Sequence, residues 1–511
     1  MSDMELSFAQ HYHERTKYAP QTLATKSRAL DFSQQPALYK DYKLGTALDL
    51  KPYLDGESFD NPEASQWQRL SRLLYCTYGI TGMVPYVDAP FYMRAAPSAG
   101  GLYPAELYLI AREGSILPAG LYNYQVATHS LLRFWDSHVW SSLQSACLWH
   151  PALEQAKLAV IVTAVFMRSA WRYEDRAYRR IFLDCGHVLG NLALAASIHD
   201  YRPHLIAGFV DAQLNQLLYV DPEQEGAIAA LALADLLSVE QNLPPTPTVL
   251  PSETDYDYPH LIEGQLLPYC HHATEIVADP EMVYPDQVEL CQGIQDKYNF
   301  PFCLKVSAKS LPIEWGAALR GLEETLLKRR STRRYTGGGI AFSELSSLLD
   351  FTYQPQHYLN QNLDGAPDFC DLNLIETFVV VSEVTGLDSG CYYYAVHQNE
   401  LRQIRFKNFR RELHYLCLQQ DLGRDAAAVV FHTADLEAAI ARYGDRAYRY
   451  LHLDAGHLGQ RLNLAAIRLG LGVSGIGGFF DDLVNEVLGL PPDEAVLYIT
   501  TLGRPPESGS M

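Results

Sequence analysis

The stretch RYEDRAYR at residues 172–179 recurs as RYGDRAYR at residues 442–449, a shift of 270 residues. From residue 171 to residue 187, 11 of 17 positions are identical at this shift. Chance would give about one or two identities over that length, so the chain contains a duplication.

The same shift pairs other parts of the chain. It aligns residues 120–124 with 390–394, and residues 208–211 with 478–481. A constant shift over about a hundred residues indicates two copies of one fold. So long a period is typical of a fused dimer and not of a solenoid built from short repeats.

The domain organisation follows from the repeat. We expect copy 1 at residues 61–240 and copy 2 at residues 313–511. Residues 241–312 are rich in proline and are predicted to be an extended linker. Residues 1–60 are polar and are predicted to be an irregular N-terminal extension without a counterpart in copy 2.

Each copy mixes strands with helices. Strands are predicted at residues 106–110, 158–165, 377–381 and 427–432 because these are short apolar runs. A long apolar helix is predicted at 179–199, with a twin at 449–469. Helices of that kind are buried on most sides. Two places remain open for them: the seam between the copies, or the core of each copy.

Composition excludes several classes of protein. The chain has 511 residues, 48% of them hydrophobic and 20% charged, which is typical of a globular protein. A net charge of −20 opposes nucleic-acid binding. We expect no membrane span, because apolar runs such as residues 158–167 are short. Without a secretory signal or a Cys-x-x-Cys pair, a cytoplasmic protein is expected.

The most concentrated group of cations is KRRSTRR at residues 328–334. Guanidinium groups and a hydroxyl suit the oxygens of a phosphate. The run from Lys328 to Arg334 is therefore a candidate phosphate site. A solvated basic turn is the alternative interpretation.

Two segments are rich in small residues. RAAPSAGGLYP at 94–104 contains Pro97, Ser98, Ala99 and Gly100, which would let the backbone lie against a flat ring. LGVSGIGGF at 471–479 contains Gly477 and Gly478, and it can present backbone N–H groups to an electron-rich atom. A plain turn remains an alternative for each segment, and the second is not a dinucleotide fingerprint.

Two Arg-Tyr pairs precede the long helices. Arg172 with Tyr173 and Arg442 with Tyr443 are candidate catalytic residues, since a phenol can act as an acid or base. A buried structural role is the alternative. His187 and His457 are interpreted as core or interface histidines. No spacing typical of metal ligands occurs, so no metal site is predicted.

Taken together, these motifs resemble the nitroreductase-like flavoproteins, in the branch that contains the azoline dehydrogenases of thiazole/oxazole-modified peptide biosynthesis. The motifs that carry the resemblance are RAAPSAGGLYP, GLYNY, RYEDRAYR, GIGGF and the opening YHERTK at residues 12–17. The resemblance implies an α+β chain in which two tandem nitroreductase-like α/β/α domains form an intramolecular pseudo-dimer.

The resemblance also implies FMN bound between two protomers. One protomer would hold the phosphate with Arg329, Ser331 and Arg333, with Arg330 adjacent, and with Arg504 from a late Gly-Arg-Pro segment. The same protomer would place a backbone N–H of Gly477 or Gly478 at flavin N5. The other protomer would lay Pro97, Ser98, Ala99 and Gly100 against the ring.

These features are divided unequally between the copies. The basic cluster occurs in copy 2, and the stretch aligned with it at 54–58 lacks it. The Pro-Ser loop occurs in copy 1, and the constant shift aligns it with Pro367-Asp368-Phe369-Cys370. We therefore expect one complete FMN site per chain and a monomer whose two copies pair internally.

The resemblance has one departure. The azoline dehydrogenases use a Lys-Tyr pair, and this chain has Arg-Tyr at both aligned positions. Arginine cannot be deprotonated as lysine can. The resemblance thus implies FMN binding without implying azoline oxidation.

The predicted function is that of an FMN-dependent oxidoreductase transferring hydride through flavin N5. Its substrate would be small or peptidic, and NAD(P)H is one candidate donor. Nitroreduction and azoline dehydrogenation both remain open. The alternative is a non-catalytic scaffold that binds flavin or a partner in a peptide-modifying complex.

Overall fold

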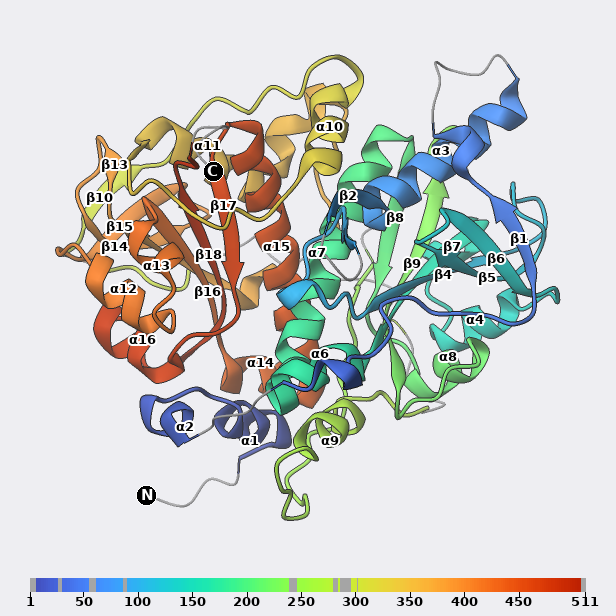
Figure 1. Ribbon diagram of the computed structural model, residues 1–511, viewed down its shortest axis with the longest axis horizontal. Coiled ribbons are helices and arrows are strands. Elements are labelled where there is room, and N and C mark those ends of the chain that lie inside the picture. Colours follow the sequence, from blue (N-terminus) through green and yellow to red (C-terminus); the bar gives the residue numbers. More distant parts are fainter. Residues whose placement is uncertain are drawn as a thin grey trace.

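Two sheets, one in each half of the chain, face each other across a pair of long helices (Figure 1). The computed structural model describes residues 6–25, 30–54, 61–85, 90–238, 246–278, 284, 296–300 and 302–506. The two halves repeat the same architecture, so the predicted fold class is confirmed.

Each large sheet has seven strands, and every pairing within it is antiparallel. In copy 1 the spatial order is β1 (Thr46–Asp49), β6 (Ser130–Trp135), β5 (Gly120–Gln125), β4 (Ala105–Ala111), β7 (Leu158–Val165), β9 (Glu225–Asp235) and β8 (Tyr201–Ile206). In copy 2 it is β10 (Leu304–Ser307), β15 (Glu400–Arg405), β14 (Gly390–Ala395), β12 (Glu376–Val381), β16 (Ala428–Asp435), β18 (Glu494–Gly503) and β17 (Gly472–Ile476). The four predicted strands correspond to β4, β7, β12 and β16.

Helices and two small two-stranded sheets complete both copies. Copy 1 has α3 (Pro62–Tyr78), α4 (Trp140–Ala146), α5 (Ala152–Gln155), α6 (Phe166–Tyr173), α7 (Ala177–Ile198), α8 (Asp211–Leu217) and the pair β2 (Ile80–Val84) and β3 (Phe91–Arg94). Copy 2 has α10 (Arg320–Lys328), α11 (Phe342–Tyr353), α12 (Arg410–Leu416), α13 (Asp421–Asp425), α14 (Leu436–Tyr443), α15 (Ala447–Arg468), α16 (Asp481–Leu488) and the pair β11 (Ile340–Ala341) and β13 (Val384–Thr385).

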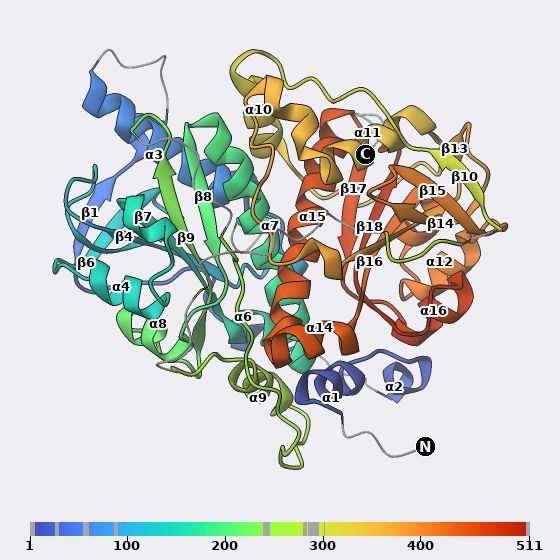
Figure 2. The ribbon, with the colours of Figure 1, turned by 180° about the vertical axis from the view of Figure 1, so that it is seen from behind.

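The predicted long helices are α7 and α15, and they pack against each other at the seam (Figures 1 and 2). Their backbones touch where Gly186 meets Gly456. A Cβ atom on Gly186 would lie 2.2 Å from the Leu453 carbonyl oxygen, and one on Gly456 would lie 2.3 Å from that of Leu183. Glycine is therefore required at the crossing, and the seam alternative is the correct one.

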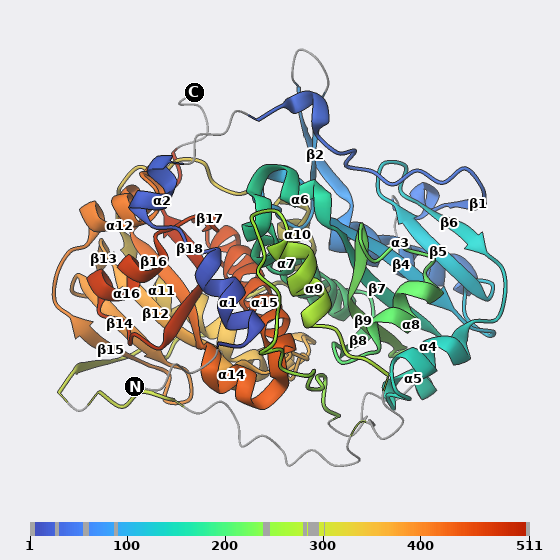
Figure 3. The same cartoon turned by 90° about the horizontal axis from the view of Figure 1, so that it is seen from below.

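The N-terminal segment differs from the expectation of an irregular extension. It contains α1 (Phe8–Arg15), closed by a capping box at Ser7, then α2 (Pro20–Thr25). The Pro-rich segment likewise contains α9 (Leu266–Ala273), and β10 at its end joins the sheet of copy 2. Both α1 and α9 lie against the ends of the two long helices (Figure 3).

The helices α1 and α9 are equivalent elements, because each completes one of two hydrogen-bond networks that have the same form. Arg179 donates to the His13 carbonyl (2.6 Å), the Thr16 hydroxyl and Asp481 of the opposite copy (2.8 Å). Arg449 makes the matching bonds to the residues His271, Thr274 and Asp211.

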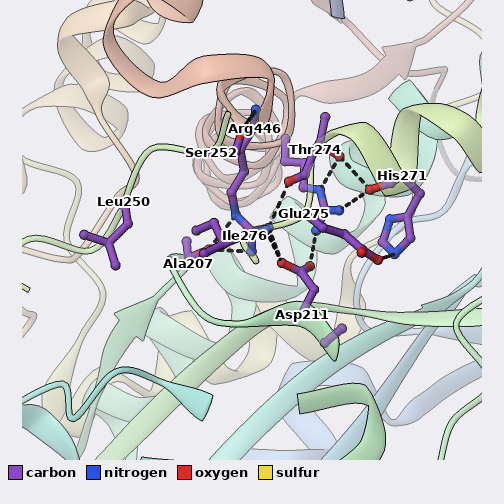
Figure 4. A network of polar contacts seen from close by, with 12 residues as sticks. Ala207, Asp211, Leu250, Ser252, His271, Thr274, Glu275, Ile276 and Arg446 are labelled. Atoms are coloured by element: carbon purple, nitrogen blue, oxygen red, sulfur yellow. Dashed lines mark hydrogen bonds and ion pairs between the residues drawn. The ribbon is translucent and has the colours of Figure 1, made fainter. Parts of the chain in front are cut away.

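Figure 4 shows part of the second network, in which Arg446 also donates to Asp211 at 2.6 Å. Both networks join the copies, since each contains arginines of one copy and an aspartate of the other. Two parts of the chain predicted to be an extension and a linker therefore complete the interface between the copies.

One described stretch, Phe166–Ile198, is long and apolar enough to cross a membrane by length and composition alone. In its most apolar window 83% of the residues are buried within the protein. The stretch is longer than the apolar runs considered in the sequence, because it joins α6 to α7. Its burial is that of a core helix at the seam.

We predict that Gly186→Ala lowers the free energy of unfolding by about 1–3 kcal/mol, because the new methyl group must push two helix backbones apart. Gly190→Ala, one turn later on the same helix, is the control, because the three atoms nearest to its Cβ would be side-chain atoms of His457 and Gln460, at 3.0 to 3.3 Å. Denaturant unfolding of both variants measures the difference. Equal stability of the two variants would contradict the prediction that the backbone contact at Gly186 requires glycine.

Candidate active site

The loop that follows β3 is held by a buried carboxylate. Ser98 donates its hydroxyl to Asp184 at 2.5 Å, and the Ala99 N–H donates to the same carboxylate at 3.1 Å. The hydroxyl of Ser98 also accepts from the Tyr103 N–H at 2.8 Å. Ser98 thus points inward and fixes the loop, although the sequence suggested a contact to a ligand ring.

Two glycines let this loop turn tightly. Gly100 and Gly101 have φ values of 64° and 68°, in the left-handed region that favours glycine. A Cβ atom on Gly100 would lie 2.7 Å from the Tyr173 hydroxyl, so the backbone approaches that side chain closely. The loop and the end of α6 therefore form one surface.

Asp184 was not singled out in the sequence. Burial raises the pKa of Asp184 to about 7, against the opposing effect of the bonds from Ser98 and Ala99. Its counterpart Asp454 accepts the N–H groups of Cys370 and Asp371, and burial raises its pKa to about 7 as well. The sequence contains a signal for Asp184 and Asp454: an aspartate stands at the same position of both long apolar helices.

The arginines of copy 2 reach the loop of copy 1. Arg329 is 3% exposed and donates through Nε to the Ala95 carbonyl and through Nη2 to the Arg94 carbonyl at 3.2 Å. Its Nη1 is buried and has no hydrogen-bond partner among the described residues. Burial lowers the pKa of Arg329 to about 10, so the side chain stays charged at neutral pH.

The other residues of the basic cluster differ in whether their side chains are already bonded. Arg330 donates to the Thr81 hydroxyl at 3.0 Å and to the Thr81 carbonyl, which ties it to copy 1. Ser331 is half-buried and Arg333 is exposed. Within the described part of the chain, neither has a hydrogen bond or ion pair from its side chain. The cluster therefore offers unused donors beside a segment that is anchored across the seam.

The glycine turn of copy 2 comes to the same place. Arg180 donates to the Gly477 carbonyl at 3.2 Å, and its guanidinium lies 3.5 Å from the centre of the Tyr173 ring. A Cβ on Gly478 would lie 3.5 Å from Arg180 Nη2. The structure thus brings Tyr173, Gly477 and Gly478 close together through Arg180, which the sequence did not single out.

Other predicted residues lie apart or are already paired. Arg504 is bound to Glu344 at 2.6 Å and to the Gly339 carbonyl. Arg442 and Tyr443 both contact Asp371, at 3.0 and 2.9 Å, in the pseudo-symmetric position of copy 2. Arg172 is exposed beside Tyr173. The two Arg-Tyr pairs therefore do not act at one place.

The pseudo-symmetric position is filled by side chains. Arg202 is paired with Asp364 at 2.8 Å and with Asp368 at 3.1 Å, and Phe369 stacks on His457 with 4.2 Å between ring centres. At the constant shift, Arg202 and His204 of β8 correspond to the small residues Gly472 and Ser474 of β17.

The loop register also differs from the constant shift. Cys370 and Asp371, and not Asp368 and Phe369, bond the helix aspartate as Ser98 and Ala99 do. Of the stretch 54–58 aligned with the basic cluster, residues 55–58 lie outside the described part.

The seam histidines are structural. His187 contacts the Leu183 carbonyl at 2.8 Å and the Tyr498 hydroxyl at 3.2 Å. Burial lowers the pKa of His187 to about 4, so its imidazole is neutral at neutral pH. This agrees with the interpretation of these residues as interface histidines.

Comparison with known proteins decides the family. The nitroreductase family matches the chain twice, at residues 68–234 and 326–504. The chain belongs to the nitroreductase family. Each copy is thus a nitroreductase domain.

Two relatives illustrate the match. The chain is similar to a nitroreductase-like protein from Anabaena variabilis whose crystal structure is known, with a TM-score of 0.93. The two sequences are 64% identical, and the match covers 98% of this chain and 100% of that one. A nitroreductase-like protein of Methanocaldococcus jannaschii is 31% identical over 183 residues, which are 36% of this chain and 90% of that protein.

A third relative agrees with the predicted branch. The trifolitoxin-processing protein TfxB of Rhizobium leguminosarum is 28% identical over 162 residues. The match covers 29% of this chain and 41% of TfxB. The resemblance to the azoline dehydrogenase branch is thus consistent with a relative named as a trifolitoxin-processing protein.

We predict that Asp184→Asn changes how stability depends on pH. Between about pH 4 and pH 7 the folded protein keeps a proton on Asp184 that the unfolded chain loses, so this group's contribution falls as the pH rises. The difference in unfolding free energy, wild type minus variant, should fall by up to about 1.4 kcal/mol per pH unit in this window.

Denaturant unfolding from pH 5 to pH 8 measures this difference. Asp136→Asn, at an exposed aspartate, controls for loss of a surface charge and should show a constant difference. A constant difference for Asp184→Asn as well would mean that Asp184 is ionised throughout the range.

Proposed function

We propose that the chain is an FMN-dependent oxidoreductase with one flavin per chain, bound between the basic cluster of copy 2 and the Pro-Ser loop of copy 1. The observation that carries the proposal is the buried Nη1 of Arg329, which has no partner in the described structure and sits beside that loop. A phosphate oxygen would satisfy it with a charge-assisted bond of about 1.5–3 kcal/mol.

The donor set fits a phosphate. Arg329 Nη1, the Ser331 hydroxyl and the Arg333 guanidinium are available without breaking a hydrogen bond between described residues. Arg504 would first have to leave Glu344, so its part in phosphate binding is the weakest of the predicted contacts. In a chain of net charge −20 such a cluster is needed to attract an anion.

Bound FMN would supply two-electron redox chemistry at N5. The protein's own residues would position the flavin and the substrate. Asp184 fixes the Pro-Ser loop, Arg180 holds the Gly477 turn against Tyr173, and Tyr173 offers a phenol beside Gly100. Arg172, exposed next to Tyr173, would attract an anionic group of the substrate.

The substrate class rests on the relatives. Similarity of one stretch of the chain to a trifolitoxin-processing protein supports a peptidic substrate. A small substrate is compatible with the same site. NAD(P)H is the electron donor that we propose to test first. We also propose that the protein is a monomer and that it works in the cytoplasm.

We predict that purified protein contains one FMN per chain, because Arg202 and Phe369 occupy the second position. Arg333→Ala should weaken FMN binding at least about tenfold through loss of a charge-assisted bond. Arg334→Ala, exposed one residue later, is the matched control and should bind like the wild type.

Flavin release and fluorescence titration measure stoichiometry and affinity. Arg329→Ala is a poorer test, because it also removes bonds to Arg94 and Ala95. Two flavins per chain, or equal affinity in the Arg333 and Arg334 variants, would contradict the placement of the phosphate.

We also predict that Tyr173→Phe slows reoxidation of the reduced flavin by a nitroaromatic substrate at least about a hundredfold, the lower end of the usual contribution of an acid or base group, with FMN affinity unchanged. Tyr443→Phe is the control, because it changes the pseudo-symmetric tyrosine bound to Asp371. Stopped-flow absorbance with a nitroaromatic as the electron acceptor measures this reoxidation. A peptidic azoline would donate hydride, so it is mixed with the oxidised flavin, and the rate of flavin reduction is measured instead. A bound flavin that no donor reduces would favour a non-catalytic scaffold.

A further inference from the structure

A group of possible metal ligands lies away from the candidate active site. Cys76 is near the end of α3, His199 follows the last residue of α7, and Glu323 is on α10. One ligand atom from each, the thiol sulfur, a ring nitrogen and a carboxylate oxygen, lies within 4.8 Å of the other two. The first two come from copy 1 and the third from copy 2.

The imidazole of His199 gives independent evidence for a ligand. Its side chain is only 7% exposed, and its Nε2 has no hydrogen-bond partner in the described part of the chain. The Glu323 Oε1 atom is 3.9 Å from this nitrogen, which is too far for a hydrogen bond. A polar atom left unpaired in the interior is unfavourable, so a group bound here would satisfy it.

The three donors indicate the metal. Zinc accepts thiolate, imidazole and carboxylate ligands at about 2.0–2.3 Å, and many of its sites have three protein ligands and one open position. Calcium and magnesium prefer oxygen ligands, which are a minority here. Glu323 is 22% exposed, so its long side chain can move inward and the ion can enter from solvent.

Two arginines lie near His199, Arg69 and Arg72. Arg72 also lies near Cys76, where it adds a positive charge, and it donates to the Leu54 carbonyl at 3.3 Å. Arg69 donates to the His199 carbonyl at 2.9 Å, but its charge is balanced by Asp235 at 2.6 Å and by Asp200 at 3.9 Å. The carboxylate of Glu323 has no salt bridge to an arginine or lysine within the described residues. It is therefore available to balance the charge of an ion.

We propose that Cys76, His199 and Glu323 bind a zinc ion that fastens α10 of copy 2 to α3 and α7 of copy 1. The helix α10 ends at Lys328, immediately before Arg329. An ion at Glu323 would hold the start of the segment that crosses to the loop of copy 1. The zinc site does not depend on the flavin proposal, since none of its ligands contacts the candidate active site.

The test is zinc binding by the full chain without an affinity tag. Protein is loaded with zinc sulfate, passed over a desalting column and analysed by plasma mass spectrometry. We expect one zinc per chain in the wild type. Competition with a chromophoric chelator should show at least tenfold weaker binding by Glu323→Gln. The control Glu324→Gln changes the next residue of the same helix, which is exposed and pairs with Lys328.

A second readout distinguishes coordination from adventitious binding. Cobalt bound to the wild type should give a thiolate-to-metal charge-transfer absorption. Cys76→Ser should lack it, and Cys147→Ser, at another buried thiol, should keep it. Circular dichroism checks that each variant folds. If a cysteine variant does not fold, the result for Glu323→Gln, a change at a partly exposed residue, decides the test. Less than one tenth of a zinc per chain in the wild type, or equal affinity in the Glu323 and Glu324 variants, would overturn the proposal.

Discussion

The contact on which the rest of the structure depends is the crossing of α7 and α15 at Gly186 and Gly456. Without side chains at these positions, the two helix backbones touch directly. This contact sets the distance between the sheets and therefore which loops of one copy meet the other. The approach of Arg329 to the loop after β3 and the pairing of each Asp–Arg network across the seam both require it.

The segments before each domain supply hydrogen bonds that the buried charges at the interface need. Arg449 and Asp211 are fully buried, and such a pair is favourable only when all of its remaining hydrogen bonds are made. The carbonyl of His271 and the hydroxyl of Thr274, at the end of α9, make them, as His13 and Thr16 do for Arg179. Each repeat therefore begins with a short helix that completes the interface.

The duplication has become asymmetric at its two equivalent positions. On one side small residues and unused donors surround an anchored loop. On the other side Arg202, Asp364, Asp368 and Phe369 fill the space with ion pairs and a ring stack. Because the copies are joined covalently, the two equivalent positions do not have to remain alike. The filled position can then contribute to holding the copies together.

The sequence by itself determined the duplication, the family and the segments that form the candidate active site, because repeats and motifs are local patterns. It did not reveal that α1 matches α9, since His13 and His271 are 258 residues apart and not 270. Only the tertiary structure showed that Ser98 faces Asp184, that Arg504 is paired with Glu344, and that Cys76, His199 and Glu323 meet. These facts depend on burial and on approach between segments distant in sequence, which no local pattern encodes.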